Sequence, residues 1–317
     1  MSSTGSSPAL PPKPKRSPVP IVAGIVVAVL VVVGAVIFFN RGGDDVTTTA
    51  AGGAEAQTVK IGVADKAQDY WKPYVELAKS QLNVDVELVN FGDYSLPNPA
   101  LSQGELDINQ FQHIQYLANY NVTADDDLQP IASTAVYPLP LYSTTVDDAS
   151  AIPQGSVVAI PNDAINEARG LLVLQSAGLI TLADGGNAYS TVSDVTSAKV
   201  KVTPIDASQT ANALLSGSAV AAIVNQNYAT DAKLPLDDAI AQDDPSDPTA
   251  APYVNLFAVR AEDKGNETYR KLGELWHDPS VQELFKKANP TAVVVDESAA
   301  KLQADLATVE QDARDAA

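Results

Sequence analysis

The side chains that could carry out chemistry are unevenly represented in this chain. There is no cysteine, and the only histidines are His113 and His277. Thiol catalysis, disulfides and thiolate zinc sites are therefore excluded, and a zinc site made of several imidazoles lacks its ligands. The sequence also contains no Gly-x-Ser-x-Gly elbow, no Gly-x-x-x-x-Gly-Lys-Ser/Thr phosphate loop and no His-Glu-x-x-His motif.

Aspartates are plentiful, and a pair of carboxylates could assemble in space without leaving a linear motif. An extracytoplasmic hydrolase is therefore kept as a minor alternative. The acidic runs at residues 125–127 and 243–247 lack the glycine and the terminal glutamate of an EF-hand calcium loop, so we interpret them as solvated loops. We predict a protein that is not an enzyme, with no catalytic residues, no metal site and no cofactor.

The elements that must position any site follow an α/β pattern. The predicted strands of a first lobe are residues 58–63, 84–89 and 106–109, and its predicted helices are residues 70–82 and 97–103. A second lobe is predicted from strands at residues 157–160 and 219–224 and a helix at residues 164–177, which Gly178 ends. Strands alternating with helices favour parallel sheets covered by helices. Residues 255–259 form a further predicted strand, before helical C-terminal segments.

The N-terminus has three parts. Residues 1–20 are rich in Ser and Pro and carry Lys13, Lys15 and Arg16, which predicts a disordered cytoplasmic tail. Residues 21–39 carry no charge, and 19 helical residues nearly span a hydrocarbon layer of about 30 Å. We interpret them as a transmembrane anchor. A cleaved signal peptide is the competing interpretation, but its apolar region would be shorter and its cleavage site closer. Residues 40–57 form a flexible linker.

The charge of the chain limits its partners. With 20 Lys and Arg against 39 Asp and Glu, the formal net charge is −19. Such a charge opposes nonspecific attraction to nucleic acid and to anionic lipid surfaces. We therefore expect no nucleic-acid partner and membrane attachment only through the N-terminal helix. The protein is predicted to be a single-pass protein of the cell membrane, with its C-terminal domain extracellular.

Four ordered motifs carry a resemblance to a known family. Residues 91–120 read FGDYSLPNPALSQGELDINQFQHIQYLANY, with Asn-Gln-Phe-Gln-His at 109–113 as the specific core. The others are Ile-Pro-Asn-Asp at 160–163, Asn-Gln-Asn-Tyr-Ala at 225–229 and Pro-Tyr-Val-Asn at 252–255. These segments resemble the methionine-binding lipoproteins of the NlpA type, the extracytoplasmic receptors of methionine ABC importers.

The resemblance implies a two-lobed periplasmic-binding-protein fold, type II-like, with the ligand in a cleft between the lobes. Lobe 1 would consist of residues 58–140 and 252–317, and lobe 2 of residues 141–251. The implied function is to capture methionine of either hand, a close analogue or a methionine-containing dipeptide, and to deliver it to an ABC permease with its ATPase. A surface adhesion or sensory module on the same fold is the alternative from another class.

The resemblance also implies a set of ligand-binding residues. These are Tyr94, Phe111, His113, Tyr116, Asn166, Arg169, Asn225 and Asn255. A guanidinium binds a carboxylate through two parallel hydrogen bonds, asparagines both donate and accept, and aromatic rings favour a thioether. We expect the Arg169 guanidinium to be solvated when the cleft is empty.

Structural roles compete with each of these assignments. Arg169 could be a surface arginine on a helix, and the asparagines could serve in loops and caps. Phe111 and Tyr116 could pack in the core, since positions 113 and 116 lie three apart on one predicted helix. His277, before Asp278 and Pro279, is interpreted as structural.

The chain departs from the family pattern in three places. The lipid-bearing N-terminal cysteine is replaced by the predicted membrane anchor. Ala164 and Ile165 stand where proline and a small hydroxyl residue are common, and Gln110 stands where a second aromatic residue is frequent. The first pair affects the shape of the loop, and Gln110 would make the side-chain pocket more polar.

Overall fold

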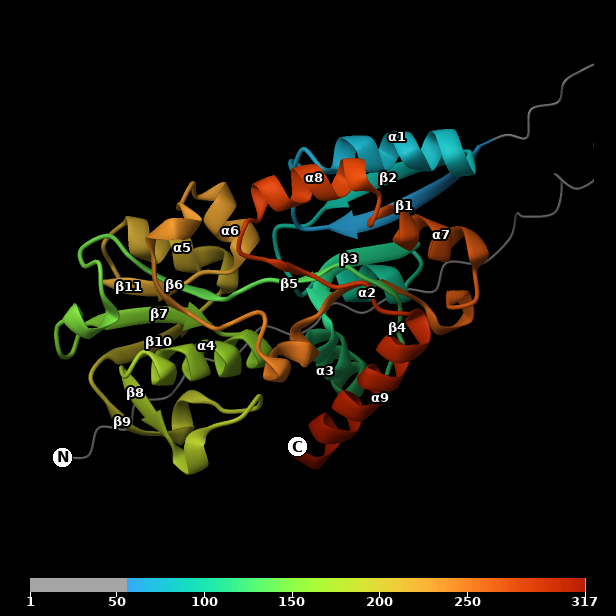
Figure 1. The fold of residues 1–317 in the computed structure, drawn as a ribbon. Coiled ribbons are helices and arrows are strands. Elements are labelled where there is room, and N and C mark those ends of the chain that lie inside the picture. Colours follow the sequence, from blue (N-terminus) through green and yellow to red (C-terminus); the bar gives the residue numbers. More distant parts are fainter. Residues whose placement is uncertain (1–55, 317) are drawn as a thin grey trace, which may run out of the picture. The chain divides into compact units, whose positions relative to one another are not determined.

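The computed structural model describes residues 56–316, so the predicted tail (1–20), the predicted anchor (21–39) and nearly all of the linker (40–57) lie outside the described residues. Between residues 56 and 316, no helix is long and apolar enough to cross a membrane. This part of the chain contains two five-stranded sheets with helices on both faces of each, as Figure 1 shows. We call the two halves lobe 1 and lobe 2. They agree with the predicted two-lobed α/β fold.

Lobe 1 is built on a sheet with the strand order β2-β1-β3-β13-β4. Its strands are β1 (Gln57–Val63), β2 (Val84–Asn90), β3 (Ile108–His113), β4 (Gln129–Ser133) and β13 (Asn255–Val259). β1 is parallel to β2 and β3, whereas β13 lies antiparallel between β3 and β4. The prediction that the first three strands form a parallel sheet is confirmed, and β13 makes the complete sheet mixed because it enters from the other lobe without the helical crossover that enforces a parallel direction.

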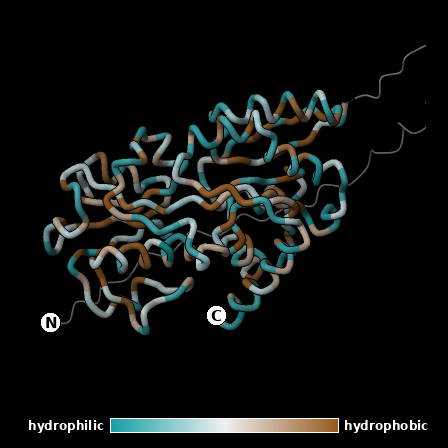
Figure 2. The backbone as a smooth tube through the Cα atoms, viewed as in Figure 1, coloured by the Kyte–Doolittle hydropathy of each residue, from teal (hydrophilic) through white to brown (hydrophobic). Residues whose placement is uncertain are grey.

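Two groups of helices cover the faces of this sheet. One face carries α1 (Trp71–Leu82), α7 (Glu267–Leu275) and α8 (Pro279–Ala288), and the other carries α2 (Pro97–Ser102), α3 (Ile114–Ala124) and α9 (Ala299–Ala316). The short strands β5 (Ala135–Val136) and β14 (Val293–Val294) pair with each other. In Figure 2 the hydrophobic segments follow the strands, and in β1 the residues Val59, Ile61 and Val63 are fully buried. Their spacing of two places all three on one face of β1.

Lobe 2 has the strand order β10-β7-β11-β6-β12. The strands are β6 (Pro140–Ser143), β7 (Val157–Pro161), β10 (Lys201–Ile205), β11 (Ala221–Ile223) and β12 (Ala239–Gln242). β7 is parallel to β10 and β11, and β6 is antiparallel to β11 and β12, so this sheet is mixed as well. The remaining elements are α4 (Ala164–Ser176), α5 (Ala207–Leu215), α6 (Gln226–Asp231) and the hairpin of β8 (Ile180–Leu182) and β9 (Val195–Ala198).

Local signals define α4, the helix that faces the cleft. Asp163 caps its N-terminus, because the carboxylate accepts a hydrogen bond from the Asn166 backbone N–H at 2.9 Å. Gly178, with φ +71°, follows its C-terminus, as the sequence predicts. Six short 3-10 helices complete the described elements: η1 (Ala149–Ala151), η2 (Ala183–Gly185), η3 (Val192–Asp194), η4 (Leu236–Asp238), η5 (Pro248–Tyr253) and η6 (Ala261–Asp263).

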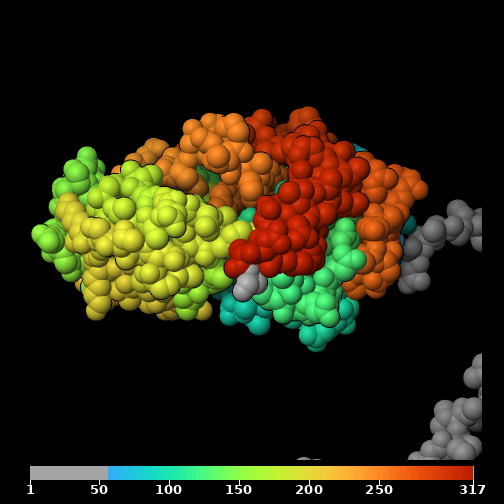
Figure 3. Space-filling model, turned by 90° about the horizontal axis from the view of Figure 1, so that it is seen from below, coloured from blue at the N-terminus to red at the C-terminus, as the bar shows by residue number. Residues whose placement is uncertain are grey.

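Two segments of the chain join the lobes. The first, residues 137–139, lies between β5 and β6, and the second, residues 243–254, lies between β12 and β13. α9 also borders lobe 2 (Figure 3), where the Tyr189 hydroxyl donates to the Val309 carbonyl at 3.4 Å.

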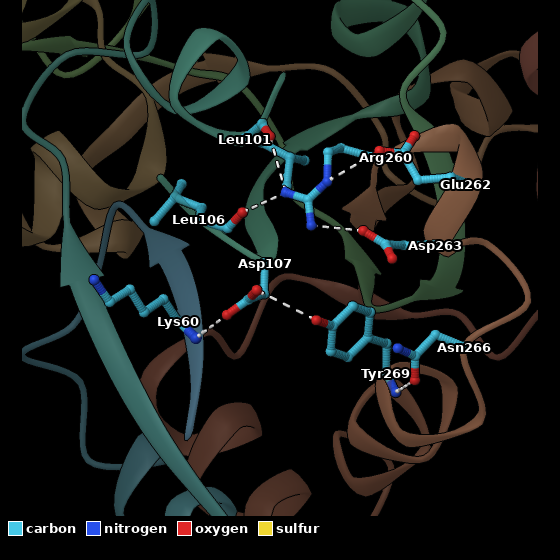
Figure 4. A network of polar contacts seen from close by, with 9 residues as sticks. All are labelled: Lys60, Leu101, Leu106, Asp107, Arg260, Glu262, Asp263, Asn266 and Tyr269. Atoms are coloured by element: carbon cyan, nitrogen blue, oxygen red, sulfur yellow. Dashed lines mark hydrogen bonds and ion pairs between the residues drawn. The ribbon is translucent and has the colours of Figure 1, made fainter. Parts of the chain in front are cut away.

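A polar network holds the loop between α2 and β3 in place (Figure 4). Arg260 Nη1 donates to the carbonyls of Leu101 and Leu106 at 3.1 and 2.6 Å, and Arg260 Nη2 pairs with Asp263 at 2.6 Å. The Asp107 carboxylate accepts from the Lys60 backbone N–H at 2.8 Å and from the Tyr269 hydroxyl at 3.2 Å. The loop between α2 and β3 is therefore held to the neighbouring strands before β3 begins.

Candidate functional site

One cavity lies where the two lobes meet. The space open to the centre of a water molecule is about 90 Å³, enough for several waters or a small ligand. Its lining comes from the loop after β1, from β3, from α4, from the start of α6, from the first connecting segment and from the first residue of β13. Ligands of open α/β sheets bind at the carboxyl ends of the strands, and β1, β3 and β11 present their carboxyl ends here.

All eight predicted site residues line this cavity. They are Tyr94, Phe111, His113, Tyr116, Asn166, Arg169, Asn225 and Asn255. His277 lies elsewhere, between α7 and α8, where its Nε2 lies 3.0 Å from the Ser133 carbonyl oxygen. Within residues 56–316, no three His, Asp or Glu side chains are grouped as metal ligands would be.

Arg169 is buried and held on three sides. Its Nε donates to the Asp243 carboxylate at 2.7 Å, its Nη2 donates to the Tyr137 carbonyl at 2.7 Å, and its Cζ lies 4.2 Å from the centre of the Tyr253 ring. The residue is only 5% exposed. The expectation of a solvated guanidinium is therefore wrong, because Arg169 is buried and Asp243 and the Tyr137 carbonyl pair with two of its five N–H groups inside the protein. Two N–H groups on Nη1 and one on Nη2 remain for a ligand carboxylate.

The asparagines form a chain of hydrogen bonds from α4 to α6. Asn166 Nδ2 donates to the Asp163 carboxylate at 2.9 Å, and Asn225 Nδ2 donates to Asn166 Oδ1 at 2.9 Å. Burial raises the pKa of Asp163, although its hydrogen bonds from Asn166 oppose the shift. Asn225 Oδ1 is buried without a partner among the described residues. It is therefore an acceptor available for an ammonium group. Asn255 donates to the Tyr253 carbonyl at 3.3 Å.

The aromatic residues form one wall of the cavity. The Phe111 ring lies 6.0 Å from that of Tyr94 and 5.8 Å, edge to face, from that of Tyr116. Tyr94 is also within 5.0 Å of the Tyr228 ring, and its hydroxyl donates to Asn227 Oδ1 in the other lobe. The Tyr228 hydroxyl donates to the Gly92 carbonyl at 3.1 Å. The wall therefore also joins the two lobes beside the cavity.

His113 does not share a helix with Tyr116 in the way the sequence predicted. It is the last residue of β3 and the N-cap of α3, and its Nδ1 accepts from the Tyr116 backbone N–H at 3.2 Å. Burial and, to a smaller extent, the positive charge of Arg169 hold the pKa of His113 well below its ordinary value. A neutral imidazole that accepts at Nδ1 carries its proton on Nε2, so it can donate a hydrogen bond there.

The sequence analysis missed two lining residues, Asp65 and Gln226, and one residue that holds Arg169, Asp243. Asp65 accepts from the Tyr70 hydroxyl and, at 2.9 Å, from Trp71 Nε1, and burial raises its pKa. The signal was available, because Asp65 follows the carboxyl end of β1. Asp243 was assigned to a solvated loop, but it accepts from Arg169 and, at 2.7 Å, from the Leu139 backbone N–H. Gln226 lines the cavity with both amide atoms buried and without a partner among the described residues.

Comparisons with known proteins agree with this geometry. A family model described as NlpA lipoprotein matches residues 59–296. A D-methionine-binding lipoprotein, MetQ, of Escherichia coli K12 is 36% identical over 233 residues, which cover 72% of this chain and 84% of the relative. Protein PG110 of Staphylococcus aureus has a TM-score of 0.75 at 35% identity, covering 79% of this chain and 99% of the other.

A solved nutrient-binding protein from Burkholderia cenocepacia bound to methionine is also similar. Its TM-score is 0.69 at 36% identity, over 74% of this chain and 99% of the other.

We predict that His113 makes stability depend on pH. The unfolded imidazole titrates near 6.5, whereas in the folded chain its pKa is lower. Above pH 6.5 neither state binds this proton. As the pH falls below 6.5, only the unfolded state takes it up, so the free energy of unfolding decreases by up to about 1.4 kcal/mol per pH unit until the folded pKa is reached.

Urea unfolding of the full-length chain at pH 7.5 and 5.5 measures this loss. His113→Asn keeps an N-cap acceptor but cannot titrate, so it should lose less stability over this interval. Equal losses of unfolding free energy in the wild-type chain and in the variant would contradict the assignment of this pH dependence to His113. Other titrating groups, Asp65 and Asp163 included, are common to both chains and drop out of the difference.

Proposed function

This chain belongs to the NlpA lipoprotein family, and we propose from this premise that it is an extracytoplasmic solute receptor that captures methionine, or a close analogue, for an ABC permease. The observation that carries the proposal is the cavity lined by both lobes, in which a buried arginine with free N–H groups lies beside an aromatic wall. The names of the relatives favour transport over the adhesion or sensory alternative.

Different residues of the cavity would bind different groups of the ligand. Arg169 would bind the carboxylate through Nη1 and Nη2, the one edge of its guanidinium that protein groups leave open. Asn225 Oδ1 would accept from the ammonium group, and His113 Nε2–H offers a further donor. Because Asp243 already balances the charge of Arg169, recognition of the carboxylate would depend on hydrogen-bond geometry more than on net charge.

The aromatic wall would receive the side chain of the ligand. Tyr94, Phe111 and Tyr116 offer ring faces and edges at one place, and a thioether sulfur near a ring edge gains about 0.3–1.5 kcal/mol. Tyr94 and Tyr228 reach the opposite lobe, so closure of the lobes would complete the wall and exclude water.

The attachment of the receptor is a separate part of the proposal. We propose that residues 21–39 form a single transmembrane anchor, with Lys13, Lys15 and Arg16 on the cytoplasmic side. The full-length chain should then stay in the membrane fraction after carbonate extraction, and protease added to intact cells should digest its C-terminal domain. Recovery of a soluble mature form that begins near Gln57 would contradict the anchor.

Methionine should bind the full-length chain and stabilise it. A ligand that binds only the folded state adds RT ln(1 + [L]/Kd), about 2.7 kcal/mol at a hundredfold excess over Kd. For a protein of this size that raises the melting temperature by roughly 5–10 °C. Calorimetric titration and thermal melting with a panel of amino acids are the measurements. If another solute gave heat and a shift while methionine gave neither, the specificity would be wrong.

Substitutions at Arg169 separate ligand binding from folding. Arg169→Ala should lower methionine affinity about thirtyfold or more, because the bound carboxylate loses its buried partner. It should also lower the ligand-free melting temperature by about 5 °C or more, because Asp243 and the Tyr137 carbonyl lose their donor. Arg169→Lys should restore affinity only in part, since an ammonium cannot make two parallel bonds.

Two controls make this experiment decisive. Arg270, a half-exposed arginine on α7, lies outside the cavity, so Arg270→Ala should change neither the methionine affinity nor the ligand-free melting temperature. Asp243→Asn should lower the ligand-free melting temperature and should weaken methionine binding much less than Arg169→Ala does, because it keeps the donors on Nη1 and Nη2 of Arg169. If Asp243→Asn and Arg169→Ala weakened binding equally, Arg169 would be a structural brace and not the carboxylate partner.

A further inference from the structure

β3 contains a bulge at the cavity. Gln112 is opposite Leu256 of β13, and Asn109 is opposite Ala258. Two residues of β3, Gln110 and Phe111, therefore lie against the single residue Phe257. Such a two-against-one arrangement bends a strand and turns its side chains, and it occurs often beside functional sites. Gln110 and Phe111 both line the cavity.

The bulge changes which side chains share a face. In a regular strand, residues three apart point to opposite faces. Here Gln112 Nε2 donates to Asn109 Oδ1 at 3.0 Å, so the two side chains lie on the same side. The extra residue in β3 accounts for this, because Asn109 and Gln112 face positions of β13 that are only two apart.

A third amide, from α2, completes the cluster. Asn98 Nδ2 donates to Gln112 Oε1 at 2.8 Å, while Asn98 Oδ1 accepts from Asn109 Nδ2 at 2.9 Å and from Gln112 Nε2 at 2.6 Å. We call Asn98, Asn109 and Gln112 the amide triad. Their exposed fractions are 1%, 0% and 2%, so no member can exchange its partners for bulk water. A buried amide network of this kind fixes one geometry, since any other leaves polar atoms unpaired.

The triad connects two parts of the aromatic wall. Asn98 belongs to α2, which begins three residues after Tyr94, and the other two members flank Gln110 and Phe111 in β3. Arg260 holds the far end of α2 through the Leu101 carbonyl (Figure 4). α2 is thus fixed at both ends against the strand that carries Phe111.

We propose that the amide triad holds the β3 bulge in place and thereby positions Phe111 against the side chain of the ligand. Asn98 and Asn109, which do not line the cavity, are then positioning residues that set selectivity for a long apolar side chain. The identity of the ligand in this inference rests on the proposed function, whereas the claim that the amide triad holds the β3 bulge does not.

The selectivity test compares methionine with 2-aminobutyrate, which keeps the carboxylate, the ammonium and the first two side-chain carbons. The Kd for 2-aminobutyrate divided by the Kd for methionine, both in the full-length chain, measures how well the wall contacts the rest of the methionine side chain. In Asn98→Ala, Gln112 and Asn109 lose partners and the bulge relaxes, so this ratio should fall about fivefold, close to the loss of one buried methylene group.

Asn121 supplies a matched control. It is also a buried lobe 1 asparagine, 2% exposed, and bonds the Leu128 carbonyl and Glu310, but it does not line the cavity. Asn121→Ala should lower the melting temperature as Asn98→Ala does and leave the Kd ratio unchanged. If Asn98→Ala also left the ratio unchanged, the triad would be structural only and the proposal would be overturned. Asn98→Ser, which keeps one hydrogen-bonding group, replaces Asn98→Ala if that variant does not fold.

A second readout does not depend on any ligand. Hydrogen–deuterium exchange of the ligand-free, full-length chain should be faster in residues 108–113 of the Asn98 variant than in the Asn121 variant. Equal exchange there would overturn the proposal even if methionine binds. If the wild-type chain bound no methionine, the proposed function would fail, and faster exchange would still support the triad as the element that holds the bulge.

Discussion

The Arg169–Asp243 ion pair joins the parts of the molecule on which the cavity depends. Arg169 comes from α4 of lobe 2, the Tyr137 carbonyl from the first connecting segment, and Asp243 from the second, where it also accepts from Leu139. Two of the five N–H groups of this buried guanidinium are paired with these segments, which holds both segments close to α4. Arg169 lines the cavity, and its N–H groups that these contacts leave open can receive an anion there.

Several polar atoms beside the cavity are buried and unpaired among the described residues. Asn225 Oδ1 and both amide atoms of Gln226 are buried beside the cavity without partners among the described residues. Each such atom costs about 1–3 kcal/mol relative to a paired one. The folded chain tolerates this loss of stability because it buries large aromatic residues such as Trp71, Trp276 and Phe285. A site that keeps acceptors unpaired in the protein gains more when a ligand pairs them.

Part of the element pattern could be predicted from the sequence, whereas the register of the strands could not. The helices at α1 and α4 were predicted because apolar spacing and an end signal such as Gly178 are local. The bulge in β3 could not be predicted, since it exists only relative to β13, about 145 residues later in the chain. Asp243 was misassigned for the same reason, because its partner Arg169 is 74 residues away. The eight lining residues came from family likeness, which carries the long-range information that periodicity lacks.

The position of α9 has a consequence for the speed of lobe motion. The helix follows the region that the family model matches, packs on lobe 1 through Leu302, Leu306 and Val309, and bonds lobe 2 through one hydrogen bond of 3.4 Å. A hydrogen bond contributes about 0.5–1.5 kcal/mol, which changes a rate constant by about twofold to thirteenfold. The hydrogen bonds beside the cavity, from Tyr94 to Asn227 and from Tyr228 to Gly92, therefore hold the lobes together more than this hydrogen bond of α9 does.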